Sequence, residues 1–544
     1  MIDTELSAEK NVPFILEQHK RLSQSLLWKL QRTFFEEHGI EAWRLGEVPH
    51  YITNNPFIAG AYAKVVIGFL KDCKNNAEAS EEAAFKLDHK QPVYIVELGA
   101  GSGRFAFHFL KQFLGLLRGS VFSDIPVKYV MTDFSERTLD YWRTHPWLQP
   151  FVEQGLLDFA RFDCEQDNEP ILTHCGDILS EGTVRNPLII LANYFFDSIP
   201  QDAFYINQGY IYESLVTLTC PQMQSDTSDP DLLNTVEITY DHRPVNGDYY
   251  HDSDFDQILR DYVDSLEDTM LLFPCTAVRC IRDLAKLSNG RLLLLSADKG
   301  YSRKEDVLGR GCPQFKVHGS LSMMVNYHAI GQYVLNQGCA VLQTAHRHKS
   351  LNVSAFTLGL PPIAAVETNQ AYVEAIERFG PDDFYNLKKG VEKFYDSLTL
   401  PQIFAYLRLS GWDANIFLGC FPTLLGLVDS LSKLEQQELY RVILQVWDTY
   451  YPIGEEKDLA FSLGMLLYGM AYYPEALDYF EQSLLLYGRD ISTVYNMGMC
   501  HYNLGQLETA LACIDQVLAL DPELKTTWDM RTKIQAEIER HNHQ

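Results

Sequence analysis

The stretch "VYIVELGAGSGRF" (Val93–Phe105) decides the fold. Its first half is almost entirely apolar, which predicts a buried strand, and the amphipathic segment that follows it predicts a helix. Between the two, Gly99, Gly101 and Gly103 occupy every second position. Glycine has no Cβ atom, so it lets the main chain turn sharply and lets a ligand come close to it. We therefore expect a strand–turn–helix unit whose turn binds a ligand.

The acid Glu97 lies at the end of this strand, two residues ahead of the first glycine. In dinucleotide-binding turns of the form G-x-G-x-x-G, a diphosphate lies at the helix N-terminus, where a neighbouring carboxylate would repel it. Here the spacing is G-x-G-x-G and the acid precedes it, which favours a cationic ligand. S-adenosylmethionine carries a sulfonium and an ammonium group. We predict that it is the cofactor and that Glu97, Gly99, Ala100, Gly101 and Gly103 bind it.

Two further strands end near an acid. The run "VKYVMTD" ends at Asp133, and an acid at this place can accept hydrogen bonds from both ribose hydroxyls. For the amino group of adenine we predict Asp177, in "THCGDIL", with Asp163, in "RFDCE", as its competitor.

Short apolar runs alternate with helix-length amphipathic stretches from residue 93 to about 360. Six predicted strands with helical crossovers indicate an α/β fold with a mostly parallel sheet covered on both faces. Two alternating runs around Asn207–Gly209 predict a hairpin, and the acidic stretch from Gln224 to Asp254 predicts a loop. The six strands are expected in "VYIVEL", "VKYVMTD", "LLDFARFD", "LIILANYF", "RLLLLSAD" and "CAVLQTA".

Residues 1–90 are predicted to be helical. One helix is expected over "LSQSLLWKLQRTFFEEHG", where Gly39 ends it. A second is expected over Asn55–Cys73, with Asn55 as its cap and Pro56 at its first position.

The C-terminal part predicts an all-helical repeat region. Gly464 and Gly498 are 34 residues apart, and so are Ala476 and Ala510. This period, with small residues at these positions, resembles tetratricopeptide repeats, in which paired helices approach closely. The segment "TTWDMRTKIQAEIER" begins a third copy and is expected to form a capping helix. A plain helical bundle is the alternative.

The α/β part resembles class I S-adenosylmethionine-dependent methyltransferases, which have a Rossmann-like fold. The segment "PLIILANYFFDSIPQDAFYI" (Pro187–Ile206) is similar to that of the MidA-like family, where Asn193, Asp197 and Pro200 match. Mitochondrial members of that family are complex I assembly factors that methylate a protein arginine. The resemblance covers roughly residues 45–360 and implies N-methylation of an arginine-type protein side chain.

Other segments of the resemblance follow in the expected order, with two departures. "RLLLLSADKGYS", with Asp298, resembles the family's "DYG" strand, and a late segment ends in the family's Thr-Ala-His at His346. Tyr194 stands where the family has a glutamate, and Lys299 stands where it has an aromatic residue. Arginine stays protonated at neutral pH, so its methylation needs carboxylates that hold it and accept a proton. The loss of one acid therefore bears on the choice of acceptor.

The resemblance implies a catalytic set of Asp197, Asn193 and Tyr194. Asp197 would orient the substrate or act as base, Asn193 would hydrogen-bond beside the reactive methyl, and Tyr194 would form a pocket wall or a hydroxyl partner. Helix capping by Asp197 is the structural alternative. An S-adenosylmethionine-binding assembly factor or scaffold, and a small-molecule methyltransferase, are the alternative functions.

The composition of the chain limits the partners and the compartment that can be expected. The chain has 544 residues, 46% hydrophobic, and a formal net charge of −27, from 72 acidic and 45 basic side chains. That charge disfavours nucleic acid as a partner. Eleven scattered cysteines without metal-ligand spacing predict reduced thiols in the cytoplasm and no metal site, and no apolar run predicts a membrane span or a secretory signal.

Four parts follow from these patterns. They are an N-terminal helical part (1–90), the methyltransferase domain (91–360), a helical connector (361–455) and the repeat domain (456–544). The repeats are expected to bind a substrate or partner protein, or to serve a homodimer.

Overall fold

The computed structural model describes residues 13–79, 85–165, 171–221, 227–313, 315–318 and 320–542. It divides into two compact units, Met1–Tyr385 and Asn386–Gln544. The division falls inside helix α12 (Pro381–Val391), so residues 361–385 lie in the first unit rather than in a separate connector.

A seven-stranded sheet forms the centre of the first unit. Its five strands β4, β3, β2, β7 and β12 are parallel, β18 is antiparallel to β12, and β17 is antiparallel to β18. The predicted mostly parallel sheet is confirmed, with β18 as a strand that the sequence pattern had not indicated. In order across the sheet the strands are β17 (Val341–Leu342), β18 (Asn352–Leu358), β12 (Leu292–Asp298), β7 (Leu188–Asn193), β2 (Val93–Leu98), β3 (Val127–Asp133) and β4 (Leu157–Arg161).

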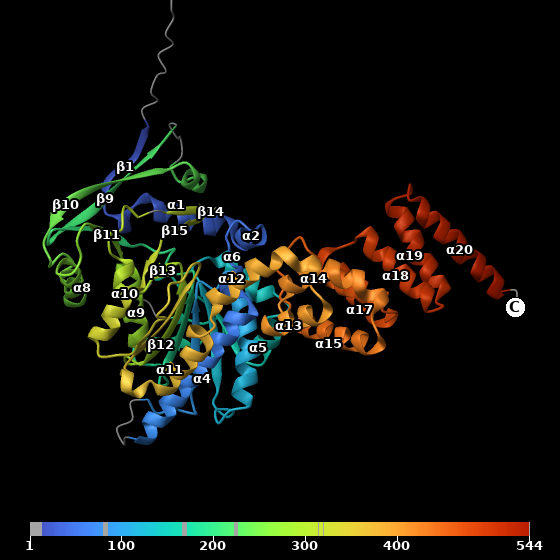
Figure 1. The fold of residues 1–544 in the computed structure, drawn as a ribbon, viewed down its shortest axis with the longest axis horizontal. Coiled ribbons are helices and arrows are strands. Elements are labelled where there is room, and N and C mark those ends of the chain that lie inside the picture. The colour runs from blue at the N-terminus through green and yellow to red at the C-terminus, as the bar shows by residue number, and fades with distance from the viewer. Residues whose placement is uncertain are drawn as a thin grey trace, which may run out of the picture. The chain divides into compact units, whose positions relative to one another are not determined.

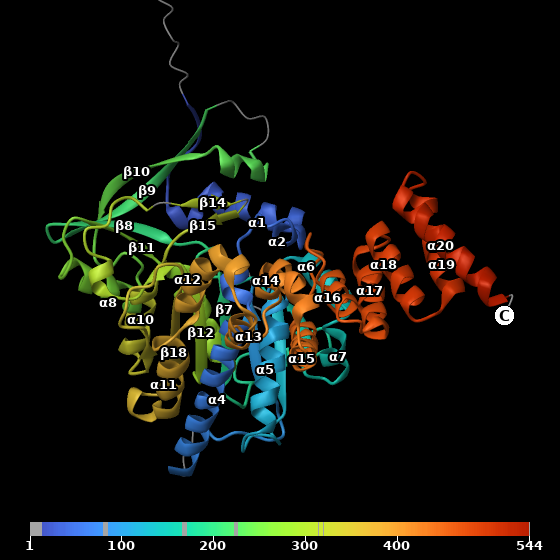
Figure 2. The ribbon, with the colours of Figure 1, turned by 45° about the vertical axis from the view of Figure 1, so that its right-hand side comes forward.

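One group of helices packs on this sheet through α4 (Pro56–Ala79), which lies between α5 (Arg104–Arg118) and α11 (Val366–Tyr372) (Figures 1 and 2). The side-chain oxygen of Asn55 accepts hydrogen bonds from the amides of Phe57 and Ile58, at 3.0 and 3.1 Å. This satisfies two of the amides that a helix leaves free at its start, so the predicted cap is confirmed.

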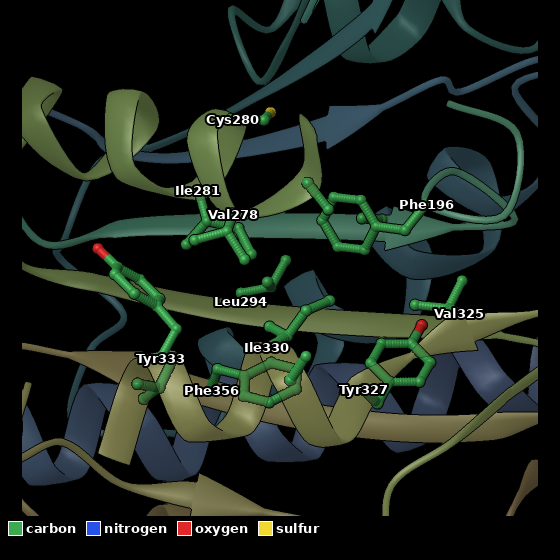
Figure 3. Close-up of a cluster of buried hydrophobic side chains, with 14 of the residues drawn as sticks. Phe196, Val278, Cys280, Ile281, Leu294, Val325, Tyr327, Ile330, Tyr333 and Phe356 are labelled. Carbon is green, nitrogen blue, oxygen red and sulfur yellow. The ribbon is translucent and has the colours of Figure 1, made fainter. Parts of the chain in front are cut away.

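A second group of helices covers the hydrophobic core shown in Figure 3. Val278 and Ile281 of α9 (Cys275–Leu287) meet Leu294 of β12, Ile330 of α10 (Tyr327–Asn336) and Phe356 of β18 in one buried cluster. Each such side chain contributes roughly 1.5–3 kcal/mol when it leaves water. This core fixes β7, β12 and α10 relative to one another. Three further helices of the unit are α6 (Glu136–Thr144), α7 (Gln149–Glu153) and α8 (Ser253–Val263).

A second sheet is antiparallel, with the order β1-β9-β8-β11 and β10 paired to β9. The predicted hairpin is confirmed: β8 and β9 are joined by a tight turn in which Gln208 and Gly209 have positive φ, +49° and +77°. The strands are β1 (Phe14–Lys20), β8 (Asp202–Asn207), β9 (Tyr210–Cys220), β10 (Glu237–Val245) and β11 (Thr269–Phe273).

Two predictions of secondary structure are wrong in this sheet. β1 lies in the part expected to be helical, and β10 lies in the part expected to be a loop. Both strands are largely exposed, and both pair with β9. Leu16 of β1 and Ile238 and Tyr240 of β10 pack against a buried cluster, but so few partly buried side chains leave little hydrophobic pattern for sequence reasoning to detect.

The N-terminal helices α1 (Leu26–His38), α2 (Glu41–Arg44) and α3 (Tyr51–Asn54) follow β1. Gly39, with φ +50°, ends α1 as predicted. In Figures 1 and 2, α1 and a short hairpin lie between the second sheet and the main sheet. The short strands of this unit are β5 (Ile171–Leu172), β6 (Ile178–Leu179), β13 (Gly300–Tyr301), β14 (Lys316–His318), β15 (Ser320–Ser322) and β16 (Val325–Asn326).

The second unit is all-helical, as predicted. A Cβ atom on Gly464 would lie 2.7 Å from the Phe480 ring, and one on Gly498 would lie 3.1 Å from Cβ of Cys513. Both glycines therefore permit the close approach of paired helices that the repeat pattern indicated. The helices are α13 (Leu400–Leu409), α14 (Ala414–Leu427), α15 (Lys433–Thr449), α16 (Leu459–Gly469), α17 (Tyr473–Tyr487), α18 (Ile491–Asn503), α19 (Leu507–Leu520) and α20 (Lys525–Asn542).

Candidate cofactor and active site

The candidate site lies at the carboxyl ends of the parallel strands. From β2 the chain adds β3 and β4 on one side and later β7 and β12 on the other, so the winding reverses between β2 and β7. In open α/β sheets, ligands bind in the crevice at such a reversal. Glu97, Asp133, Asn193 and Asp298 stand at the ends of β2, β3, β7 and β12.

The glycine turn has the backbone that its sequence requires. Gly99, Gly101 and Gly103 have φ of +61°, +53° and +79°, a region that side-chain-bearing residues rarely adopt. The space that a Cβ would need is also taken: at Gly101 it would lie 2.8 Å from the Trp43 ring. Ala100 ties the turn to β3, because its amide donates to the carbonyl of Thr132 at 2.9 Å.

Glu97 is buried, with 3% of its surface exposed, and its Oε2 accepts a hydrogen bond from the hydroxyl of Tyr129 at 2.9 Å. Burial raises the pKa of Glu97 to about 8, against the opposing effect of that hydrogen bond, and the neighbouring Asp133 raises it further. A cation bound beside Glu97 would favour its ionised form.

Asp133 is also buried, but backbone amides surround it. The amide of Ser135 donates to Oδ1 at 3.0 Å, and the amides of Gly101 and Phe134 also stabilise the carboxylate. Burial outweighs these hydrogen bonds and raises the pKa of Asp133 to about 6. At neutral pH Asp133 is therefore mostly ionised and able to accept hydroxyl hydrogen bonds.

A cavity of about 100 Å³ lies against this edge of the sheet, and helix α1 covers it. Glu97 does not line it. Residues from six separate segments do, among them Trp43, Gly99, Asp133, Phe134, Asp163 and Tyr194.

Of the two acids that the sequence offered for the adenine amino group, Asp163, the competitor, lines this cavity and Asp177 does not. Asp177 pairs with Lys128, its Oδ2 2.7 Å from Nζ. Lys128 is the second residue of β3, whereas Asp133 is the last. At about 3.3 Å per residue, five residues separate these two positions by roughly 16 Å. The structure therefore does not bring Asp177 to the other predicted cofactor residues.

Of the three predicted catalytic residues, Tyr194 lines the cavity, whereas Asn193 and Asp197 do not. Tyr194 has φ +50°, a strained backbone of the kind found at functional sites. Asn193 accepts a hydrogen bond from the Tyr62 hydroxyl at 2.7 Å and donates to the carbonyl of Thr53 at 3.3 Å. Both ends of its amide therefore hold the N-terminal helices.

Asp197 is 5% exposed and lies outside the lining of the cavity, where it contacts Asp298. Burial raises the pKa of Asp197 to about 7, and burial together with Asp197 raises the pKa of Asp298. Asp298 Oδ2 accepts a hydrogen bond from Tyr327 at 2.8 Å, while among the described residues no donor reaches Oδ1. Two buried carboxyls in contact cannot both ionise at low cost, so the pair shares a proton.

Sequence reasoning missed the two features that complete this site. It used Asp298 only to support the resemblance, although an acid at the end of a strand beside β7 was a signal for the pair. It gave no role to α1 and α2, whose Arg32 and Trp43 line the cavity. Their contribution carried no local signal, because it depends on how the N-terminal helices dock.

Two family models match the sequence of this chain. The family model described as "Putative S-adenosyl-L-methionine-dependent methyltransferase" matches residues 81–346, and that of the tetratricopeptide repeat matches residues 493–524. The chain is thus an S-adenosylmethionine-dependent methyltransferase with a C-terminal tetratricopeptide repeat, and S-adenosylmethionine is its cofactor. No curated protein matches the sequence.

Solved structures from Burkholderia thailandensis are similar at low identity. One protein is 12% identical, with a TM-score of 0.34, over 63% of this chain and 94% of its own. A second protein, bound to S-adenosyl-homocysteine, is 13% identical, with a TM-score of 0.35, over 56% of this chain and 77% of its own. An O-methyltransferase family protein is 10% identical, with a TM-score of 0.23, over 60% of this chain and 70% of its own.

The residues around the cavity fit this cofactor in their chemistry. Asp133 offers an ionised carboxylate for the ribose, Phe134 offers an apolar face for a flat base, and Asp163 offers an acceptor for its amino group. No group of metal-ligating side chains occurs among the described residues, and no helix within the described ranges is long and apolar enough to cross a bilayer.

Proposed function

We propose that this protein is a class I methyltransferase of Rossmann-like fold, related to the MidA-like family, that methylates a protein side chain. One observation carries the proposal. Gly99, Asp133 and Tyr194 line a single cavity at the reversal point of a doubly wound sheet. Tyr194, the residue that follows β7, thereby links the cofactor residues to the predicted catalytic segment.

The acceptor side is rich in acids. Three carboxyls, those of Asp197, Asp298 and Asp382, act on the Tyr194 hydroxyl and raise its pKa, an effect second to that of burial. Two of these carboxyls share a proton, and the net negative charge that the group keeps favours a cationic acceptor such as a guanidinium. These carboxyls offset the loss of the family's glutamate at position 194, and this supports an arginine-type acceptor.

The chain's role in the reaction is alignment. S-adenosylmethionine supplies a methyl group on a sulfonium sulfur, and an acceptor nitrogen must lie in line with it. Holding both partners in a fixed geometry can supply a large part of the rate. Asp133 and the glycine turn hold the cofactor side, while Tyr194 shapes the acceptor side. The Asp197–Asp298 pair lies behind Tyr194, where it can take up a proton once the new bond has formed.

The second unit supports a protein substrate, because stacked helix pairs present a surface to which a peptide can bind. The cysteines support a reducing compartment, for which we propose the cytoplasm: all are free thiols and most are buried.

Labelled S-adenosylmethionine tests the proposal. The full-length protein would be incubated with a cell extract, with Asp133→Ala as the matched inactive control. We expect label on a protein band that resists mild alkali, because N-methyl groups do and carboxyl esters do not. Label only in small molecules would overturn the protein acceptor, and binding without transfer would favour a scaffold.

A further inference from the structure

Arg32, on the buried side of α1, lines the cavity and contacts Phe134 and Asp163, the two residues that suit a nucleobase. Its Nη2 lies 2.6 Å from Oδ2 of Asp163, and its guanidinium carbon lies 4.7 Å from the centre of the Phe134 ring. A guanidinium is flat and cationic, and it stacks on an aromatic face while it donates to a carboxylate. Arg32 therefore makes both of these contacts at once.

An adenine ring would need the same place. It requires an apolar face to stack on and an acceptor for its amino group, and Phe134 and Asp163 supply these beside Asp133. A ring between Phe134 and the guanidinium would need two contact distances of about 3.5 Å, so about 7 Å in all. The observed 4.7 Å leaves no room for it. The cavity of about 100 Å³ is likewise small against the roughly 300–1,000 Å³ of ligand pockets.

We propose that Arg32 is a gate on the cofactor site: its guanidinium fills the adenine position in the free enzyme and leaves it when the cofactor binds. This inference rests on the cofactor site proposed above. It adds that binding is a competition between adenine and a side chain of the same protein.

The opening movement belongs to the side chain rather than to α1. Gln31, the preceding residue, donates to the carbonyl of Ser198 at 3.2 Å and accepts from the amide of Leu321 at 2.6 Å. Trp28, one turn earlier, donates to the carbonyl of Leu22 at 2.7 Å. These contacts hold the helix on the β14–β15 hairpin, on the turn after β7 and on the short segment that precedes it.

Two further carboxylates lie close enough to pair with the Arg32 guanidinium when it rotates out of the cavity. Glu36 lies one helical turn further along α1, with Oε1 3.9 Å from Nη1 of Arg32, and Glu165 Oε1 lies 3.7 Å from Nη2. Both are more exposed than Asp163. Arg32 can therefore leave Phe134 and Asp163 without losing every ionic partner, which makes the gate reversible.

Calorimetry with S-adenosyl-homocysteine tests the gate. We expect Arg32→Ala to bind it about tenfold more tightly than the wild type, because an ion pair and a cation–π contact no longer compete. Arg32→Lys, which keeps the charge but cannot stack, should lie between the two. Arg44→Ala, a matched change at an exposed arginine of α2 that pairs with Glu41, should bind as the wild type does. Unchanged or weaker binding by both Arg32 variants would overturn the gate.

Stopped-flow fluorescence gives a second readout, because Trp28 and Trp43 line the cavity. In the wild type the observed binding rate should level off at high ligand concentration, where opening of the gate limits it. In Arg32→Ala it should rise linearly, and a linear wild-type rate would contradict the proposal. Asp133→Ala separates the two proposals: if it binds as tightly as the wild type, the cofactor site itself is misplaced.

Discussion

Two pairs of buried acids stand at the same edge of the sheet, and they differ in what surrounds their oxygens. Glu97 and Asp133 receive a tyrosine hydroxyl and backbone amides, and Asp133 faces the cavity. Asp197 and Asp298 face each other, and Asp298 is completely buried. The first pair is therefore prepared for a ligand with positive charge, and the second for holding and releasing a proton.

The largest effect should come from Gly101→Val, which disrupts the glycine turn beside the first pair, Glu97 and Asp133. A valine would have to adopt φ +53°, and its Cβ would lie 2.8 Å from the Trp43 ring. We expect calorimetry to detect no binding of S-adenosyl-homocysteine, a loss above about 100-fold. Gly115→Val is the matched control, because it meets nothing within 4 Å on the surface of α5. Wild-type affinity in the Gly101 variant would show that the turn has no part in binding.

The next effect should come from Asp298→Asn, which breaks the second pair. The amide keeps the size of the side chain but cannot ionise, so Asp197 is left as the one carboxyl of the pair and no longer shares a proton with a second carboxyl. We expect turnover to fall by about 100-fold, within the range that acid–base groups contribute, while affinity for S-adenosyl-homocysteine stays within twofold.

The control for this change is Ser296→Ala, which removes a hydroxyl 3.5 Å from Asp298 Oδ2 and leaves both carboxyls in place. Methyl transfer to protein from labelled cofactor measures turnover. Full turnover in Asp298→Asn would leave the pair with a purely structural role.

A smaller effect should appear in the pH dependence of cofactor binding, which tests whether Glu97 ionises when the ligand binds. Its pKa of about 8 leaves it mostly protonated in the free protein at neutral pH. A bound cation favours the carboxylate, so binding should release a proton, and affinity for S-adenosylmethionine should rise several-fold from about pH 6 to pH 8. Calorimetry in buffers with different ionisation enthalpies measures this release. Proton uptake on binding would mean that the ligand's charge lies elsewhere.

The free energy of unfolding of the ligand-free protein should fall as pH rises, whereas the affinity for the cofactor should increase. The folded-state pKa values of Glu97, Asp133 and Asp197 are raised to about 8, 6 and 7, above those of exposed carboxyls. The folded state therefore binds more protons than the unfolded state, and stability falls as pH rises from about 5 to 8. Each unit of pKa shift corresponds to about 1.4 kcal/mol.

Thermal unfolding measures this dependence. We expect the transition of the first unit to lie several degrees lower at about pH 8 than at about pH 5.5, with a shallower slope in Glu97→Gln. A slope of the opposite sign would contradict the raised pKa values.

The sequence predicted those parts of the fold and site that depend on local chemistry. Val93–Leu98, the glycine turn and the following helix form one continuous segment, whose apolar run and bare turn are visible without any partner. The same is true of the Asn55 cap and of the spacing of Gly464 and Gly498. Each of these features is determined by neighbours in the chain.

The rest depends on contacts between distant segments. β10 is a polar strand that pairs with β9, and Arg32 reaches the cavity only because α1 docks at the end of the main sheet. Two acids followed the third strand of the predicted sheet, and sequence spacing gave no means to tell which one faces the cavity. Which of Asp163 and Asp177 faces the cavity depends on the path that the chain takes between the two residues.

The smallest effect should come from Asp177→Ala, which tests the choice between the two acids. Asp177 is partly exposed and pairs with Lys128 near the start of β3, at the opposite end of the strand from Asp133. We expect affinity for S-adenosyl-homocysteine to stay within twofold and stability to fall by less than about 1 kcal/mol, as for other solvent-exposed ion pairs.

The matched change, Asp163→Ala, removes the acid that lines the cavity. It should alter that affinity several-fold, because it removes both the acceptor proposed for adenine and the partner of Arg32. Isothermal titration of the two variants side by side decides the point. If Asp177→Ala weakened binding and Asp163→Ala left it unchanged, the base would have to lie toward the opposite end of β3, and neither the cavity under α1 nor the Arg32 gate could be part of the cofactor site.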